Sequence, residues 1–236
     1  MVGTLINVVA VLGGGALGLM LGNRLPERLK STVISGLGLF TLAYGIVSFV
    51  DSHNQLVVLG SILIGAILGE WWQIEEGLRR LGHWLEDRFA GGGENAAENR
   101  FVRGFLTASL VFCVGPMAIL GSIEDGLTGN YQTLVVKSVL DAFGAVAFAS
   151  TLGVGVLFSA LIILVYQGSL TLLAVQAQAG ISPAMMTEMT ATGGVILLAI
   201  ALGSLLELRP IRSANFLPAL FLAPLLVLAF QALGIY

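Results

Sequence analysis

Residues 2–22 read VGTLINVVAVLGGGALGLMLG, a stretch without a single charged side chain. A helix that crosses the hydrocarbon core of a bilayer needs about 20 mostly apolar residues. The stretch is therefore long enough and apolar enough to span a membrane. It lacks the positively charged start and the small-residue cleavage site of a signal peptide, so we expect it to be retained as the first span.

The whole chain shares this apolar character. Of its 236 residues, 56% are hydrophobic and 11% are charged, and the mean hydropathy is +0.93. An average soluble domain has about a quarter of charged residues, and a small soluble fold still exposes much of its surface to water. The composition excludes a soluble enzyme, a disordered protein and a nucleic-acid binder. It predicts an all-α, polytopic helix bundle in contact with the lipid bilayer.

Eight stretches have the length and composition of a membrane-spanning helix. They are residues 2–22, 32–50, 55–72, 101–121, 133–151, 154–175, 185–206 and 214–234. The region 133–175 is too long for one crossing, so we divide it at Gly153 and Gly155. Seven spans plus a re-entrant segment is the alternative.

The basic residues support eight spans. With this count, ten of the eleven lie on one side of the membrane, including Arg103 at the start of the fourth span, and the eleventh, Lys137, lies inside a span. The ten are Arg24, Arg28, Lys30, Arg79, Arg80, Arg88, Arg100, Arg103, Arg209 and Arg212. Because loops rich in Lys and Arg stay in the cytoplasm, both termini are predicted to lie outside the cytoplasm.

The longest polar region divides the chain into spans 1–3 (residues 1–72), a cytoplasmic segment (73–100) and spans 4–8 (101–236). The cytoplasmic segment has apolar residues on one helical face, namely Ile74, Leu78, Leu81, Leu85 and Phe89. This pattern predicts an amphipathic helix on the membrane surface, followed by a flexible hinge at 90–95. The helix is either a gate or partner-docking element, or an anchored linker.

Small residues recur every fourth position in two of the expected spans. The two stripes are Gly14, Gly18 and Gly22 in the first span, and Ser61, Gly65 and Gly69 in the third. Such stripes let membrane helices approach closely. We therefore interpret both as contact seams, either within the chain or between subunits, and we expect a homo-oligomer.

Charged residues inside spans are costly and are functional candidates by default. Lys137 and Asp141 lie one helical turn apart beside Ser138, so the two charges face the same side. They form either a structural ion pair or a charge-compensated site for a cation, a proton or an anion. The uncharged Asn7 and Gln167 are explained by hydrogen bonds between helices.

Two further regions combine polar groups with expected helix breaks. Glu188 either binds a cation near Gly193 and Gly194, whose local unwinding would free carbonyl oxygens, or is hydrated at the outer interface. Gly115 and Pro116 predict a kink in the fourth span. Glu124 and Asp125 then stand at its outer mouth, where they either attract cations or form an ordinary polar loop.

No catalytic arrangement is visible in the sequence. His53 and His83 are expected in loops on opposite sides of the membrane, so they cannot share a metal ion. Neither a Ser/His/Asp set nor an HExxH motif is present. We expect neither enzymatic activity nor a cofactor.

The central motifs carry a family resemblance. The string FCVGPMAILGSI at 112–123, then Asp125-Gly126-Leu127, Lys137-Ser138 with Leu140-Asp141, and Tyr166-Gln167-Gly168 resembles the YqgA/YdfK-like family of bacterial integral membrane proteins. The resemblance covers the whole chain and implies a location in the bacterial inner membrane. The family is of unknown function, so it implies no substrate and no catalytic residues.

Two hypotheses follow. The first is a transporter or channel for a small solute or ion, with its site between the kinked fourth span, the Lys137/Asp141 face and the seventh span. The second is a membrane scaffold or sensor that oligomerises and binds a cytoplasmic partner through 73–100.

Overall fold

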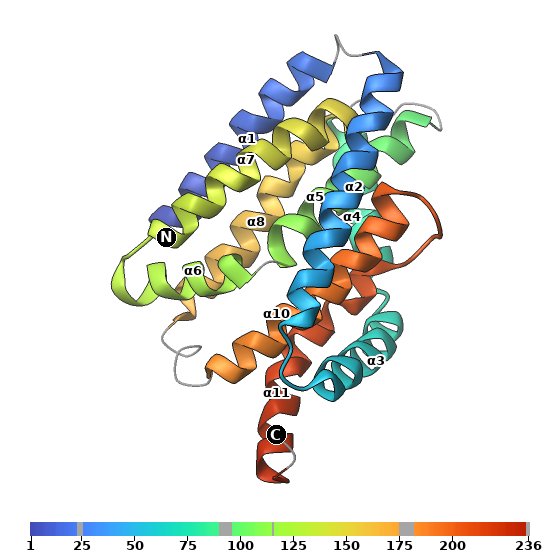
Figure 1. Cartoon of the computed structure of the whole chain (residues 1–236). Coiled ribbons are helices and arrows are strands. Elements are labelled where there is room, and N and C mark those ends of the chain that lie inside the picture. Colours follow the sequence, from blue (N-terminus) through green and yellow to red (C-terminus); the bar gives the residue numbers. More distant parts are fainter. Residues whose placement is uncertain (23–25, 90–95, 115, 175–181, 235–236) are drawn as a thin grey trace. The chain divides into compact units, whose positions relative to one another are not determined.

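The computed structural model describes residues 1–22, 26–89, 96–114, 116–174 and 182–234. This part of the chain is helical and contains no strand (Figure 1), which confirms the all-α prediction. The elements are α1 (Val2–Gly22), α2 (Glu27–Val50), α3 (Gln55–Trp72), α4 (Ile74–Phe89), α5 (Ala96–Val114), α6 (Pro116–Thr128), α7 (Gln132–Leu152), α8 (Gly155–Leu172), α10 (Pro183–Ile200), the π-helix η1 (Ala201–Leu205), the 3-10 helix η2 (Ser213–Phe216) and α11 (Pro218–Ala232).

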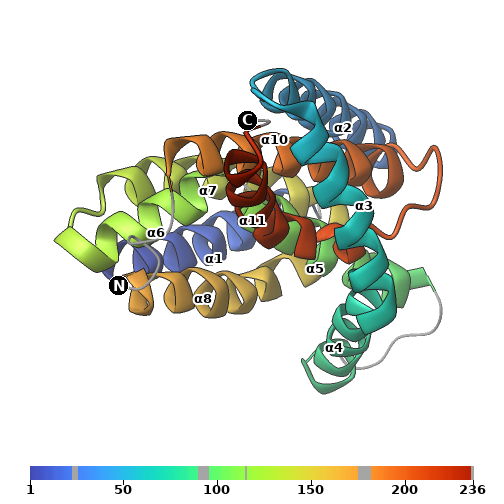
Figure 2. The same cartoon turned by 90° about the horizontal axis from the view of Figure 1, so that it is seen from below.

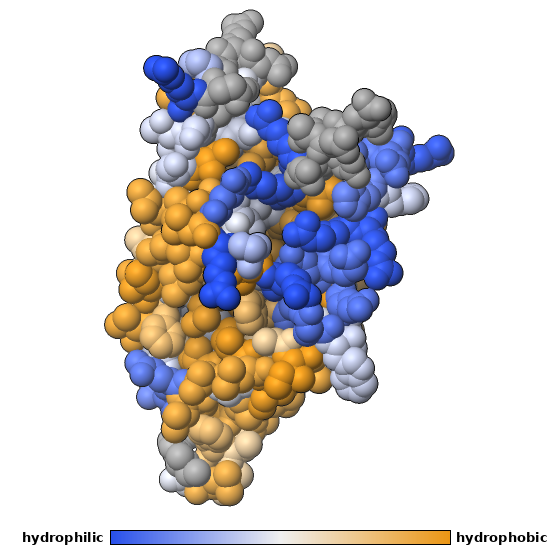
Figure 3. Space-filling view, turned by 90° about the vertical axis from the view of Figure 1, so that its right-hand side faces the viewer, coloured by the Kyte–Doolittle hydropathy of each residue, from blue (hydrophilic) through white to orange (hydrophobic). Residues whose placement is uncertain are grey.

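Seven helices of the described residues are long and apolar enough to cross a membrane. An eighth candidate is the pair Arg100–Val114 and Met117–Thr128, which are bent by 76° relative to each other. Large apolar side chains such as Val9, Met20 and Phe143 stay exposed, and Figure 3 shows hydrophobic residues together over the left-hand and lower parts of one face. Such a surface suits contact with lipid.

The chain forms two compact units. Unit 1 contains Met1–Gly36 and Arg79–Ala179, and unit 2 contains Leu37–Leu78 and Gly180–Tyr236. Each unit therefore combines an early and a late part of the sequence. These boundaries differ from the expected division at residues 72 and 100, because α2 and α4 each contribute residues to both units.

In unit 1, a stripe of glycines allows α1 to pack closely against α7. Helix α1 packs along α7 (Figures 1 and 2), and a Cβ atom at Gly14, Gly18 or Gly22 would overlap a backbone carbonyl oxygen of α7. These oxygens belong to Ala142, Val146 and Ser150, in the same order. The two helices are therefore parallel, and their backbones approach so closely that only glycine fits.

Unit 2 also contains a close backbone contact at a stripe of small residues. A Cβ atom at Gly65 would lie 2.6 Å from the backbone nitrogen of Ala219, and one at Gly69 would overlap the carbonyl oxygen of Asn215. Ser61 is buried and donates to the Val57 carbonyl oxygen of its own helix at 2.7 Å. Both predicted stripes thus form contacts with other helices of the same chain. A homo-oligomer stays a prediction, and these seams do not provide its contact surface.

The bent pair α5–α6 connects the two ends of unit 1. Near its start, Arg100 Nε donates to the Thr151 carbonyl oxygen at 3.0 Å, at the end where α7 packs on Gly22. Near its finish, Asp125 Oδ2 accepts from the Gly3 backbone N–H at 3.1 Å. Between these ends lies α1, whose 21 residues measure about 30 Å. The pair therefore reaches from one end of α1 to the other, which is the distance that an eighth span would cover.

Helix α4 occupies the segment predicted to be an amphipathic helix, and its location on the membrane surface stays a prediction. Leu85 is buried, whereas Phe89 is 66% exposed and its ring contacts that of Phe158 at a centroid distance of 5.7 Å. Glu75 is buried as well, and its Oε2 accepts from the Ala214 backbone N–H at 3.2 Å. The expected hinge at 90–95 lies outside the described residues.

Candidate intramembrane polar site

The first half of α1 places polar groups on its buried face. Gly3, Thr4 and Asn7 are buried at helical spacing, and the glycine seam continues the same face toward the end of the helix. This face contacts α7 and α8. The spacing of α1 therefore turns Asn7 toward the Lys137/Asp141 side of α7.

Four polar side chains from three helices meet in unit 1. The Lys137 ammonium forms an ion pair with Asp141 Oδ2, one turn along α7. Asn7 Nδ2 donates to the same carboxylate oxygen at 3.0 Å and to Gln167 Oε1 of α8, also at 3.0 Å. Asn7 and Gln167 are fully buried, and Lys137 and Asp141 are only 4% and 8% exposed. We call these four residues the polar site.

The ion pair determines how both amides are oriented. An ionised carboxylate only accepts hydrogen bonds, so Asn7 must turn its NH₂ group toward Asp141. The second N–H of that group then needs an acceptor, which is Gln167 Oε1. This orientation leaves Asn7 Oδ1 and Gln167 Nε2, which are buried and have no hydrogen-bond partner in the described part of the chain. Each such unsatisfied group costs about 1–3 kcal/mol, so the arrangement is expensive unless something else binds there.

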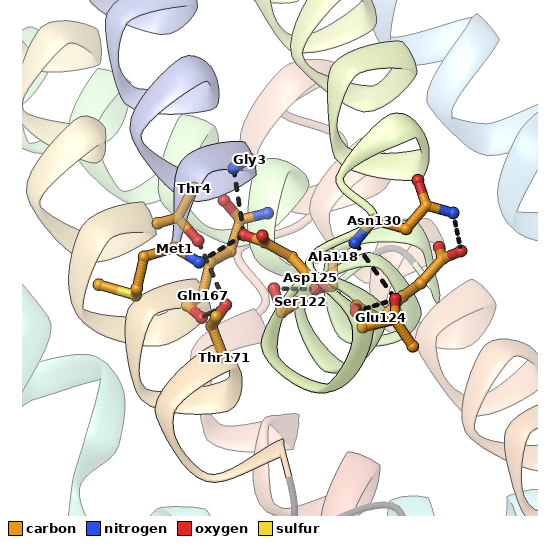
Figure 4. A network of polar contacts seen from close by, with 11 residues as sticks. Met1, Gly3, Thr4, Ala118, Ser122, Glu124, Asp125, Asn130, Gln167 and Thr171 are labelled. Carbon is orange, nitrogen blue, oxygen red and sulfur yellow. Dashed lines mark hydrogen bonds and ion pairs between the residues drawn. The ribbon is translucent and has the colours of Figure 1, made fainter.

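A second group of polar contacts lies toward the start of α1. Asp125 forms an ion pair with the Met1 amino group at 2.7 Å, besides its hydrogen bond to Gly3 (Figure 4). The hydroxyls of Thr4 and Thr171 lie 3.4 Å apart, and the Thr171 hydroxyl donates to the Gln167 carbonyl oxygen at 2.9 Å. A carboxylate at a helix N-terminus stabilises the helix, because it interacts favourably with the positive end of the helix dipole. Asp125 therefore anchors the start of α1.

Glu124 does not act together with Asp125, although the two are neighbours in sequence. Its carboxylate accepts from Asn130 Nδ2 at 2.6 Å and from the Thr133 hydroxyl at 2.7 Å. These partners hold the turn between α6 and α7. Ser138 is also separate from the polar site, because its hydroxyl donates to the Leu134 carbonyl oxygen of its own helix at 2.6 Å.

Glu188 belongs to unit 2 and is fully buried. Its Oε2 accepts from the Ser52 hydroxyl at 2.7 Å, and its Oε1 accepts from the backbone N–H groups of His53 and Asn54 at 2.9 Å each. Its surroundings are donors, whereas a bound cation requires oxygen ligands. The expectation of a hydrated interfacial carboxylate is corrected as well, because these donors replace water. Glu188 anchors the turn before α3.

The expected unwinding at Gly193 and Gly194 is wrong, because α10 continues through both residues to Ile200. Gly194 instead lies where α10 packs on α2, and a Cβ atom there would lie 2.6 Å from the Gly45 carbonyl oxygen. The irregular turn of this span is η1, seven residues further on. Gly115 lies outside the described residues, and Pro116 is the first residue of α6.

The polar site therefore includes two residues that charge alone did not select. Asn7 and Gln167 are uncharged and were expected to form ordinary interhelical hydrogen bonds. The spacing of residues along the helices could have indicated both. Asn7 lies on the same face of α1 as the glycine seam, and Gln167 and Thr171 are one turn apart on α8. Among the described residues, no group of three or more His, Cys, Asp or Glu side chains could hold a metal ion.

Comparison with known proteins bears on the whole chain. A family model described as "Protein of unknown function (DUF554)" matches residues 2–228. The chain is 33% identical over 231 residues to "Uncharacterized protein YqgA" of Escherichia coli (strain K12), covering 98% of each protein. It is 28% identical over 239 residues to "Uncharacterized membrane protein YdfK" of Bacillus subtilis (strain 168), covering 100% of this chain and 99% of that protein. No solved structure matches the chain.

Proposed function

The chain belongs to the DUF554 family of multi-pass membrane proteins, and we propose that it is a transporter or channel for a small solute or ion. One observation carries the proposal. Asn7 Oδ1 and Gln167 Nε2 are buried without a partner in the described residues, beside an ion pair in a candidate span. A purely structural network gains stability by closing all its hydrogen bonds. One that leaves a donor and an acceptor open is suited to bind a ligand.

The broken helix of unit 1 supports the same proposal. The pair α5–α6 bends between residues 114 and 117 and contacts both α7 and α8, which carry three of the four polar-site residues. Transporters often place their binding sites beside such discontinuous helices.

We further propose that the protein resides in the bacterial inner membrane with both termini outside the cytoplasm. The reach of α5–α6 from one end of α1 to the other supports this topology, because a pair that crosses gives the span count that collects the basic residues on one side. A membrane-impermeant maleimide should label Asp51→Cys in intact cells and Leu208→Cys only after lysis. Labelling of Leu208→Cys in intact cells would contradict the topology. The native Cys113 is buried and should give little background.

Flux through purified protein in liposomes tests the transport proposal. Lys137→Ala, Asp141→Ala and the double variant should each lose flux of the transported species, because each destroys the orientation of Asn7. Ser150→Ala is the matched control on α7, since its hydroxyl donates only to the Ala147 carbonyl oxygen of its own helix in the described structure. The proposal fails if no ion or small solute crosses faster than in protein-free liposomes. Neither enzymatic activity nor a cofactor is part of it.

A scaffold or sensor is the second candidate, and it is favoured by one feature of α4. Arg79, Arg80 and Trp84 are exposed on this helix, which leaves a charged and aromatic surface for a cytoplasmic partner. Replacing all three with alanine should abolish partner capture and leave liposome flux unchanged if the two roles are separate. If capture is lost from a protein that moves no solute, the scaffold function replaces transport.

A further inference from the structure

The charges of the polar site cancel. Lys137 contributes one positive charge and Asp141 one negative charge, and the two are joined in an ion pair. A cation that approaches Asp141 also meets the Lys137 ammonium, and an anion that approaches Lys137 also meets the Asp141 carboxylate. The site therefore has no net charge, and an ion that binds there would bring an unpaired charge to membrane depth, which is expensive.

The open atoms are those of neutral amides. Asn7 Oδ1 can accept two hydrogen bonds, and Gln167 Nε2 can donate two. Their identities do not depend on an arbitrary amide orientation, because the Lys137/Asp141 pair orients Asn7, and Asn7 orients Gln167. A molecule that satisfies both must donate to the first and accept from the second. Asp125, another buried carboxylate of unit 1, is paired with the Met1 amino group and the Gly3 N–H.

We infer that the polar site recognises a small uncharged solute that carries both hydrogen-bond donors and acceptors, of the urea or polyol class. The inference rests on the proposed transport function and specifies its substrate. In this arrangement the ion pair does not bind the solute by charge. It orients the two amides, so that an open acceptor and an open donor are presented to the solute.

Three planar molecules of similar size separate charge from shape. Urea is neutral, guanidinium is its cationic counterpart, and nitrate is a planar anion. Glycerol adds a second neutral solute, and glycine adds a zwitterion. The wild-type protein is reconstituted in liposomes of phosphatidylethanolamine and phosphatidylglycerol, and entry of each solute is followed by stopped-flow light scattering or by isotope uptake. Protein-free liposomes provide the baseline.

We expect urea or glycerol to enter well above the baseline, while guanidinium, nitrate and glycine do not. If one of the charged solutes enters and the neutral ones do not, the inference is overturned and the transport proposal stands. If none of the five enters but another ion does, the same conclusion holds. If nothing crosses, both are overturned, and water alone is the occupant of the site.

A matched pair of variants locates the effect. Gln167→Met keeps the length of the side chain and removes both the open donor and the acceptor of Asn7, so neutral-solute flux should fall at least about tenfold, the equivalent of one lost hydrogen bond or more. Ser159→Ala on the same helix should keep wild-type flux, because the Ser159 hydroxyl donates to the Val156 carbonyl oxygen within α8. Equal flux in Gln167→Met and wild type, with both proteins folded, would overturn the assignment of the donor.

Discussion

Units 1 and 2 each bury a carboxylate in a candidate membrane-spanning helix, but the two carboxylates have different surroundings. Glu188 in α10 accepts hydrogen bonds from a hydroxyl and two backbone N–H groups. Asp141 in α7 is held by an ammonium and an amide, and that amide leads to a second one whose NH₂ group is open. Burial is similar at the two positions, so burial does not distinguish anchor from binding site. What distinguishes them is the set of partners, because Asp141 is held by side chains that lead to an open amide, whereas the donors to Glu188 include two backbone N–H groups.

The largest effect is expected where the two units are alike, at the glycine seams. Gly18→Leu in unit 1 and Gly69→Leu in unit 2 should each prevent the accumulation of folded protein, because the new side chain would overlap backbone that cannot rotate away. The total stability of a protein is only about 5–15 kcal/mol. Gly13→Leu is the control, since a Cβ atom there meets nothing within 4 Å. Size-exclusion chromatography in detergent measures the folded fraction, and a monodisperse Gly18→Leu protein would contradict the close parallel packing.

The next effect is expected at the ion pair of Lys137 and Asp141 in unit 1. Asp141→Ala and Lys137→Ala should each cost about 3–5 kcal/mol, since each leaves the other charge buried and unpaired. The double variant should regain much of that loss in a thermal or denaturant unfolding assay. Transport should stay lost in all three. A double variant that is no more stable than the worse single variant would show that the pair is not coupled.

Glu188→Gln should show the contrasting behaviour. The amide keeps one acceptor oxygen but places its NH₂ group against a donor, so we expect a loss of about 1–3 kcal/mol. Flux per folded protein should stay at the wild-type level. Thr187→Ala is the neighbouring control, because the Thr187 hydroxyl is exposed and donates to the Pro183 carbonyl oxygen of its own helix. Loss of flux without loss of stability would make Glu188 a transport residue instead of an anchor.

The spans could be predicted from the sequence because lipid imposes one length and one composition on every crossing helix. The stretch 2–22 coincides with α1, and residues 55–72 coincide with α3. The bend at 101–121 was also visible, because Pro116 cannot continue a helix in the usual way. The sequence did not show how far this bent segment reaches, since that depends on the contacts of Arg100 and Asp125 at opposite ends of unit 1.

The candidate site was predictable in part. The four-residue spacing of Lys137 and Asp141 places both charges on one side of a helix, whatever surrounds them. The partners Asn7 and Gln167 come from helices that are far apart in sequence, so no local pattern joins them. The prediction that the helix unwinds at Gly194 was wrong for a related reason. A glycine pair reads equally as a break or as a close contact, and only the approach of α2 at Gly45 decides which applies.

The smallest effect should come from Ser52→Ala, which removes one of the donors to Glu188. The two backbone donors, from His53 and Asn54, remain at 2.9 Å, so the carboxylate stays held and the loss should be about 1 kcal/mol. If Glu188 is an anchor, each of its donors contributes only part of the stability. Ser52→Ala should then lower the free energy of unfolding by less than Glu188→Gln in the same unfolding assay. If Ser52→Ala abolishes flux while the protein stays folded, Glu188 takes part in transport, and the contrast between Asp141 and Glu188 disappears. Wild-type flux with a small loss of stability places ligand binding in unit 1 and leaves the hydrogen bonds of Glu188 a purely structural role.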